Sequence, residues 1–272
     1  MDFESIGLAI KSFDDINIHY KKNMVDNPSA IILISHGLAE HSGRYDYTVN
    51  KLNSFGYGVY RYDHRGHGLS DGRRGYLKDT SYLFEDLNSI VDLIKSENPN
   101  VPIFLLGHSI GGHSLAGFGC KYKDKVNGMV FSSPLVCDSG NWFDFYDYDD
   151  EPFLSVPVPN PHSLSHDIKA IDSYEKDSLI LDNLTIEMYK ALSISCDNMV
   201  SDLKNFTYPC FIVHGSSDTI VSCEDSKFFY ENISSTDKEL RILNGLYHSL
   251  LDEVVKDELL EEISKWIEVR LS

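Results

Sequence analysis

A serine between two glycines is the feature of this chain with the clearest chemical potential. The segment GHSIG (107–111) has the G-x-S-x-G spacing of a nucleophile elbow, a tight turn from a strand into a helix that presents the serine hydroxyl. Gly107 and Gly111 leave the turn the space that a Cβ atom would occupy. An apolar run, VPIFLLG (101–107), leads into the turn, and a stretch of small residues follows it. This context predicts that Ser109 is a nucleophile.

Two further residues have the types and the chain order that such a serine needs. Its hydroxyl requires a base, the base requires a carboxylate to orient it, and in chains with this elbow the acid and then the histidine follow the serine. Asp218 comes shortly after the strand-like run FIVHG (211–215), and His248 follows the run LRILNG (240–245). Because parallel strands end at one edge of a sheet, we expect both residues beside Ser109, as acid and base.

Asp218 and His248 also have structural interpretations that involve no catalysis. Asp218 could cap the helix that follows it, and His248 could be a histidine of a surface loop. Another base is available in His214, although we expect its side chain to point into the sheet. Asp225 is a second candidate acid, although we place it on a helix. The correct order after the elbow favours Asp218 and His248.

Backbone amides are expected to bind the negative charge that develops on the carbonyl oxygen of the substrate. One donor is the N–H of Ile110, directly after the nucleophile. The other lies in the loop HGLAEH (36–41), which follows the apolar strand AIILIS (30–35). Gly37 lets this loop turn its amides toward the site, and we assign the second donor to the N–H of Leu38.

The elements that must position these residues alternate between strands and helices. Such an alternation of short apolar strands and helices predicts an α/β fold with a mostly parallel sheet covered on both faces. An edge hairpin is expected first, over residues 6–13 and 16–24. Further strands are expected at 30–35, 56–63, 101–107, 127–133, 209–215 and 238–245. Helices are expected at 81–97, after Ser109, at 222–232, and at the end of the chain with Leu250, Val254, Leu259, Ile263 and Ile267 on one face.

The alternation stops at Pro134, and residues 134–205 have a composition of their own. They hold 14 acidic and four basic side chains, a net charge of −10. We therefore expect a core of residues 1–133 and 206–272, with residues 134–205 inserted as a cap after the sixth strand. Aromatic side chains of this cap either form its small core, which we favour, or line a tunnel for an acyl chain; they are Trp142, Phe143, Phe145, Tyr146, Tyr148 and Phe153.

Composition excludes several classes of protein. The chain of 272 residues is 42% hydrophobic and carries a formal charge of −18, which opposes binding to nucleic acid and to anionic membranes. Its five cysteines have no C-x-x-C spacing, so we expect neither a disulfide framework nor a zinc site. No apolar stretch is long enough for a membrane span, and the acidic N-terminus does not resemble a signal peptide. We expect a soluble cytoplasmic protein and make no prediction of its oligomeric state.

Several longer segments resemble one known family. HGLAEHSGRY (36–45), YRYDHRGHGLSDG (60–72), GHSIGG (107–112) and HGSSD (214–218) are similar to the monoacylglycerol lipase and lysophospholipase branch of the α/β-hydrolases, and HSLSHD (162–167) and YEKDSL (174–179) are similar to its cap. The resemblance covers nearly the whole chain. It implies an eight-stranded core, a cap over the site and hydrolysis of carboxylic esters of monoacyl lipids, with no metal and no cofactor.

The resemblance also carries over to single residues. It supports Ser109, Asp218 and His248 as the triad and the amides of Leu38 and Ile110 as oxyanion donors. Glu40 and Arg44 match the loop of the family beside the oxyanion hole, as members of an ion-pair network, and His108 is a further supporting candidate. Monoacylglycerol, cleaved to glycerol and fatty acid, is the expected substrate.

Other interpretations stay open. A lysophospholipase, a small-ester carboxylesterase and a hydrolase of amides or peptides would use the same triad, and a non-catalytic binding module would use the fold alone. The H-x4-D spacing of His41 and Asp46 is also typical of glycerolipid acyltransferases. Asp63, Arg65 and His67 suggest another site, but we expect them to brace a loop. The acidic run 138–151 follows no pattern of the family, and transient membrane contact through the cap is compatible with the sequence.

Overall fold

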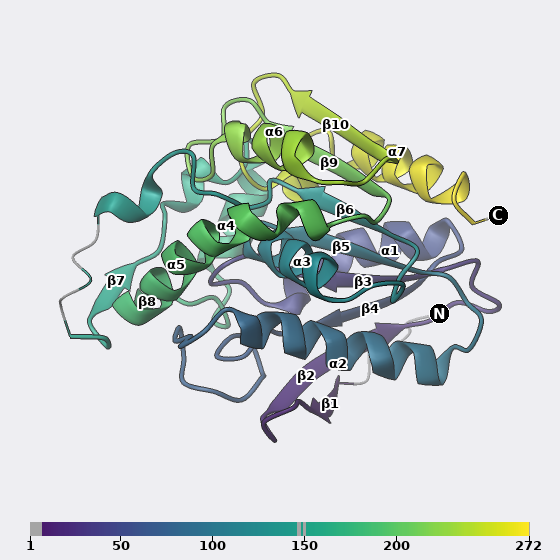
Figure 1. Cartoon of the computed structure of the whole chain (residues 1–272), viewed down its shortest axis with the longest axis horizontal. Helices are drawn as coiled ribbons and strands as arrows, with labels where there is room; N and C mark the ends of the chain where they lie inside the picture. The colour runs from purple at the N-terminus through teal and green to yellow at the C-terminus, as the bar shows by residue number, and fades with distance from the viewer. Residues whose placement is uncertain (1–6, 146–147, 149–150, 272) are drawn as a thin grey trace.

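The computed structural model describes residues 7–145, 148 and 151–271. Eight strands form one sheet in the spatial order β1-β2-β4-β3-β5-β6-β9-β10 (Figure 1). The strands are β1 (Gly7–Lys11), β2 (Asn17–Asn23), β3 (Ile31–Ser35), β4 (Gly58–Tyr62), β5 (Ile103–His108), β6 (Gly128–Ser132), β9 (Cys210–Gly215) and β10 (Lys238–Leu243).

Strand direction divides the sheet into two parts. β1 pairs antiparallel with β2, and β2 pairs antiparallel with β4, so the first two strands form the expected hairpin at one edge. The other six strands are parallel to one another, and their carboxyl ends meet at one edge of the sheet. The predicted eight-stranded, mostly parallel sheet is confirmed.

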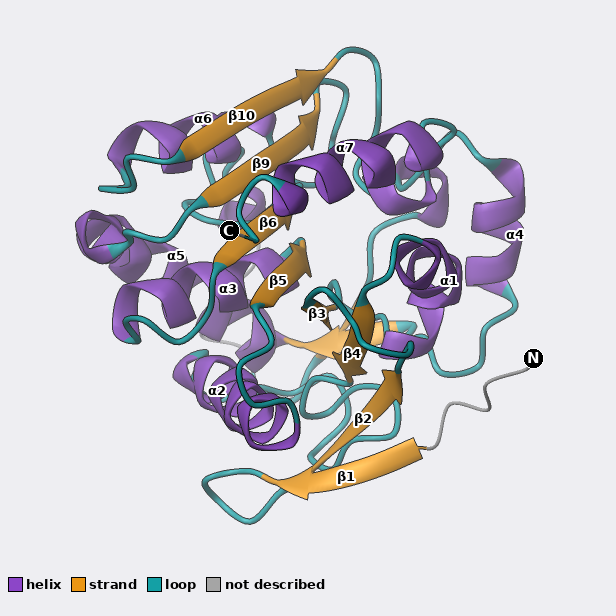
Figure 2. Cartoon of the chain, turned by 90° about the vertical axis from the view of Figure 1, so that its right-hand side faces the viewer, coloured by secondary structure: helices purple, strands orange, loops and turns teal. Residues whose placement is uncertain are grey.

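Helices cover both faces of the sheet (Figure 2). α1 (Asp46–Ser54) and α7 (Lys256–Glu268) lie on one face, and α2 (Ser81–Glu97), α3 (Ile110–Lys121) and α6 (Cys223–Asn232) lie on the other. Each face has its own cluster of buried apolar side chains. All five residues of β3 are buried, because a parallel strand in the middle of such a sheet packs helices on both sides.

Two helices differ from the expectation. α1 was not expected, because only Thr48, Val49 and Leu52 are buried in it and its apolar stripe is short. The final helix begins at Lys256 rather than near Leu250, which lies in a separate 3₁₀ turn, η5 (Leu250–Asp252). Val254, placed on the buried face by its spacing, is 64% exposed because it lies between these two elements.

The segment between β6 and β9 forms a separate layer of short elements. It contains η2 (Trp142–Phe145), β7 (Ser155–Pro157), η3 (Pro161–Ser163), α4 (Ile168–Glu175), β8 (Asn183–Thr185), α5 (Ile186–Asp202) and η4 (Leu203–Asn205). β7 and β8 pair antiparallel, away from the main sheet (Figure 1). No helix in the described ranges is both long and apolar enough to cross a membrane.

Aromatic residues of this segment have different surroundings. Phe143 is buried in an apolar cluster that also contains Ile110 of the core, whereas Phe153 is half-exposed and stacks against Arg73. Trp142 and Tyr148 are partly buried beside the same cluster. The side chain of Phe145, and all of Tyr146, lie outside the described residues. The aromatic run therefore has no single role.

Candidate active site

Ser109 lies at the turn between β5 and α3. Its backbone has φ of 54° and ψ of −117°, a conformation that residues with a Cβ rarely adopt. Its N–H donates to the carbonyl of Ser132 on β6 at 3.1 Å. A Cβ on Gly111 would come within 2.0 Å of the carbonyl oxygen of Ser35, and one on Gly107 within 2.7 Å of that of Gly111. Gly111 therefore allows the turn to pack against β3, and Gly107 allows the turn itself to close.

Asp218 and His248 meet at the carboxyl ends of β9 and β10. The Nδ1 atom of His248 is 2.6 Å from Oδ2 of Asp218, and the Oδ1 atom accepts the N–H groups of Ile220 at 2.9 Å and Val221 at 3.0 Å. Since the carboxylate can only accept, the Nδ1 atom of His248 carries the proton and its Nε2 atom is left as the basic nitrogen.

The carboxylate of Asp218 is held ionised although its side chain is fully buried. Burial acts to raise the pKa of Asp218, but the charge of His248 and the hydrogen bonds from His214 and His248 outweigh it and place the pKa well below its usual range. Asp218 is therefore negatively charged at neutral pH.

Ser109 and His248 line the same cavity, which lies between the sheet and the inserted segment. Its wall is mostly apolar, and its polar side chains are those of Glu40, His108, Ser109, Tyr174 and His248. The lining residues are Gly37, Leu38, Glu40, His108, Ser109, Ile110, Leu135, Trp142, Val158, Pro159, Leu164, Tyr174, Ile220, Val221 and His248. The inserted segment supplies six of them, from Leu135 to Tyr174, so it forms one wall of the cavity.

Leu38 and Ile110 also line this cavity. Within the described part of the chain, neither backbone N–H has a hydrogen-bond acceptor. The loop reaches this arrangement through a left-handed residue, Ala39, with φ of 64°. Gly37 keeps it close to the elbow, because a Cβ there would lie 2.9 Å from the ring of His108. Leu38 and Ile110 therefore line the same cavity as Ser109, and their assignment as oxyanion donors remains a prediction.

The supporting candidates connect this loop to its surroundings. Glu40 accepts the N–H of Gly37 at 3.2 Å and the hydroxyl of Tyr45 at 3.0 Å. Arg44 reaches α4 of the inserted segment, where it donates to the hydroxyl of Ser173 at 2.9 Å and lies 3.6 Å from Asp177. Glu40 therefore holds the loop 36–41 to itself and to Tyr45, and Arg44 ties the turn that follows it to the inserted segment.

His108 lies beside the predicted base. Its ring centroid is 4.7 Å from that of His248, and its Nδ1 atom is 3.1 Å from the carbonyl of Ser132. Burial, together with the charge of His248, lowers the pKa of His108 to about 4. His108 is therefore neutral near pH 7 and packs against the base without competing for its proton.

Asp225 and His214, the alternative candidates for acid and base, make other contacts. Asp225 lies on α6 and is fully buried, and its carboxylate accepts the backbone N–H groups of residues 136–139 at the start of the inserted segment. His214 is fully buried, as expected, but its Nε2 atom is 3.0 Å from Oδ2 of Asp218. Sequence reasoning missed this contact, although the spacing of four residues between a strand end and its loop was a signal for it.

The remaining candidates have structural contacts. His41 lies 2.9 Å from Asp177, whereas Asp46 pairs with Arg61 at 2.5 Å, so the two residues have separate partners. Asp63 accepts the N–H groups of residues 42 and 69 at 2.7 Å each and thereby braces its loop. Arg65 pairs with Asp86 and Asp14, and His67 bonds the carbonyl of Arg65, so all three support the loop after β4.

Comparison with known proteins agrees with this architecture. Residues 26–254 match the model of the Hydrolase_4 family, described as "Serine aminopeptidase, S33". The chain belongs to this family of α/β-hydrolases. The matched range contains the elbow, Asp218 and His248, together with the inserted segment.

Several curated and solved relatives of this hydrolase are named as monoacylglycerol lipases. It is 31% identical to the monoglyceride lipase of Homo sapiens over 89% of this chain and 84% of the relative, and 29% identical to the monoacylglycerol lipase of Mycolicibacterium smegmatis over 89% of each. The crystal structure of Paleococcus ferrophilus monoacylglycerol lipase superposes with a TM-score of 0.82 at 26% identity, over 93% of this chain and 99% of that one. The protein is a serine ester hydrolase of the monoglyceride lipase type.

Proposed function

We propose that the protein hydrolyses monoacylglycerols to glycerol and a fatty acid, with Ser109 as nucleophile, His248 as base and Asp218 as the residue that orients the base. The observation that carries the proposal is the composition of the cavity. Apolar side chains such as Leu135, Trp142 and Val158 suit one acyl chain, and Glu40 and Tyr174 lie among them where a polar alcohol group needs partners.

The proposed reaction has two steps. The Nε2 atom of His248 takes the proton of Ser109 while the serine oxygen attacks the ester carbonyl, and the amides of Leu38 and Ile110 bind the oxyanion. His248 then gives the proton to the departing glycerol oxygen, which leaves an acyl-enzyme. Water, deprotonated by His248, attacks this acyl group, and the proton returns to Ser109 as the fatty acid leaves.

The charge of Glu40 supports a neutral alcohol group. A phosphate-bearing head group would place negative charge close to this carboxylate, in a cavity of low polarity where like charges repel strongly. Relatives named as monoglyceride lipases are consistent with this choice.

The test is a comparison of kcat/KM on three substrates with purified protein: monooleoylglycerol, oleoyl lysophosphatidylcholine and p-nitrophenyl acetate. We expect the highest value for monooleoylglycerol. Preference for the lysophospholipid would assign a lysophospholipase, and turnover of the short ester alone would assign a small-ester carboxylesterase. Either result would overturn the proposal.

A further inference from the structure

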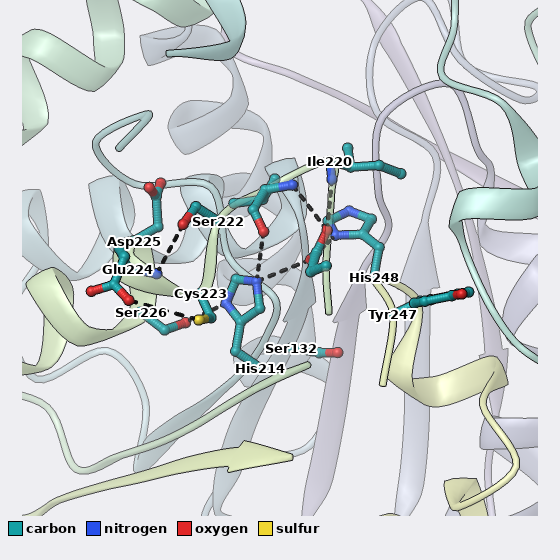
Figure 3. Close-up of polar contacts among 12 residues, drawn as sticks. Ser132, His214, Ile220, Ser222, Cys223, Glu224, Asp225, Ser226, Tyr247 and His248 are labelled. Carbon is teal, nitrogen blue, oxygen red and sulfur yellow. Dashed lines mark hydrogen bonds and ion pairs between the residues drawn. The ribbon is translucent and has the colours of Figure 1, made fainter. Parts of the chain in front are cut away.

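His214 is a fully buried histidine whose two ring nitrogens are both engaged at the carboxyl end of β9. Its Nδ1 atom lies 2.7 Å from the hydroxyl oxygen of Ser226 on α6. Its Nε2 atom lies 3.0 Å from Oδ2 of Asp218 and 3.0 Å from the carbonyl oxygen of Val221. Figure 3 shows the ring of His214 between Ser226 on one side and His248 on the other, with dashed contacts at both of its nitrogens.

The partners of His214 determine which nitrogen carries the proton. A carboxylate and a carbonyl can only accept hydrogen bonds, so the Nε2 atom of His214 is the donor toward Asp218 and Val221. In the neutral ring the Nδ1 atom is then an acceptor, and the hydroxyl of Ser226 donates to it. The hydrogen bonds therefore run in one direction, from Ser226 through His214 to Asp218.

With this donor, Asp218 has four hydrogen bonds. Its Oδ1 atom accepts two backbone N–H groups, and its Oδ2 atom accepts one N–H from His214 and one from His248. These bonds fix the plane of the carboxylate, and each of them withdraws part of its negative charge. The bond from His214 therefore reduces the attraction of Asp218 for a proton on the ring of His248.

We propose that His214 is a positioning residue of the hydrolase, which through its Nε2–H holds the Asp218 carboxylate toward His248 and moderates its charge. The proposal rests on the proposed function, because it takes Asp218 and His248 as acid and base. His214 does not touch the nucleophile: the described lining of the cavity includes Ser109 and His248 but not His214. It acts through Asp218 and is not a catalytic residue.

A purely structural role would have a different signature. His214 joins β9 to α6 through Ser226, so its loss destabilises the protein under either interpretation. Only the positioning role changes how the rate depends on pH. Without the donor, Asp218 attracts the proton of the His248 imidazolium more strongly, and the rise of kcat/KM with pH moves to higher pH.

Other ionisable groups around the site must be considered for such a pH measurement. His248 faces Asp218 from the loop after β10, and His108 on β5 packs against the ring of His248. Glu40 lines the same cavity as His248. His166 of the inserted segment stacks on the neighbouring Tyr247 and contacts Glu253. These groups are the same in every variant below, and their contributions cancel in the comparison.

The test measures kcat/KM on monooleoylglycerol against pH for the wild type, His214→Leu and His214→Gln. For His214→Leu we expect kcat to fall about 10- to 100-fold, KM to change little, and the midpoint of the ascending limb to rise. The amide of His214→Gln can still donate to Asp218, so this variant should restore the midpoint and most of kcat. An unchanged midpoint in His214→Leu would overturn the proposal.

His113→Leu is the matched control, because His113 is another fully buried histidine with both ring nitrogens bonded, to Leu135 and Ser195. It should lose stability without a shift of the midpoint, and an equal shift in this variant would contradict the assignment to His214.

If His214→Leu does not fold, Ser226→Ala replaces it: loss of the donor to Nδ1 should raise the midpoint in the same direction, and no rise would overturn the proposal. Activity that persists in Ser109→Ala would instead refute the proposed function.

Discussion

Three carboxylates near the site show that the neighbours of a buried acid determine whether it is hydrogen-bonded and in which direction its pKa moves. Asp218 accepts four hydrogen bonds and Asp225 accepts four backbone N–H groups, so each is paired although it is fully buried. Among the described residues, the carboxylate of Asp252 has no hydrogen-bond donor. Burial and the charge of Glu40 raise the pKa of Asp252 to about 6.

Replacement of Asp252 by asparagine should therefore stabilise the protein in a way that depends on pH. The folded protein keeps a proton on Asp252 up to about pH 6, whereas an unfolded chain releases it near pH 4. Ionisation of Asp252 therefore lowers the free energy of unfolding progressively as the pH rises from about 4 to about 6. We expect Asp252→Asn to gain about 2–3 kcal/mol at pH 8 and about 1 kcal/mol at pH 4.5. Urea unfolding at the two pH values measures this difference.

Asp197→Asn provides the comparison, because Asp197 is exposed on α5. Its effect should be small and equal at both pH values. A gain by Asp252→Asn that is no larger at pH 8 than at pH 4.5 would mean that the carboxylate is not held in a destabilising environment.

At the scale of elements, the site depends on how closely α3 approaches β3. Gly111 makes this approach possible, because any Cβ at that position meets the backbone of Ser35, which no rotamer change can move away. Gly111→Ala should cost at least about 3 kcal/mol of stability and most of the activity. Thermal unfolding and ester hydrolysis measure the two effects.

Gly140→Ala is the matched substitution for this prediction. A Cβ at the exposed Gly140 would lie 3.6 Å from the nearest atom, so the change should stay within about 0.5 kcal/mol of the wild type. If Gly111→Ala were tolerated as well as Gly140→Ala, the close packing of the elbow would not be what holds Ser109.

Sequence patterns predicted the elements with strong local signals and missed those that depend on packing. The apolar strands and α2 carry their periodicity in the sequence, and the eight-stranded sheet followed from them. α1 buries too few apolar residues to show a helical periodicity in the sequence. Val254 has the spacing of the buried face of α7, but it lies before that helix begins and is exposed. The four-residue spacing of His214 and Asp218 made their contact possible but did not specify it, because the contact depends on the conformation of the loop after β9.

At the scale of the whole molecule, charge is the dominant property. The 42 acidic and 24 basic residues give a formal charge of −18, which repels negatively charged surfaces within the screening length of the solution. A lipase must reach its substrate in a lipid phase, so the charge of that phase should control the rate.

We therefore expect slower hydrolysis of monooleoylglycerol in vesicles when part of the phosphatidylcholine is replaced by phosphatidylglycerol. The effect should appear at about 0.01 M salt and largely disappear at about 0.5 M. Hydrolysis of p-nitrophenyl acetate, which is dissolved in water, should not respond to the vesicles. Faster hydrolysis on the anionic vesicles would show that a local basic surface outweighs the net charge.

The central claim, that Ser109 is the nucleophile of a monoacylglycerol hydrolase, is tested most directly by glycerol release from monooleoylglycerol. Wild type, Ser109→Ala and Ser114→Ala should be compared at equal folded concentration, since Ser114 is a buried serine of α3 whose hydroxyl donates to the carbonyl of Ile110. We predict that Ser109→Ala loses activity by a factor of about 10⁴ or more, while Ser114→Ala stays close to the wild type. Glycerol release by Ser109→Ala near the wild-type rate would contradict the account.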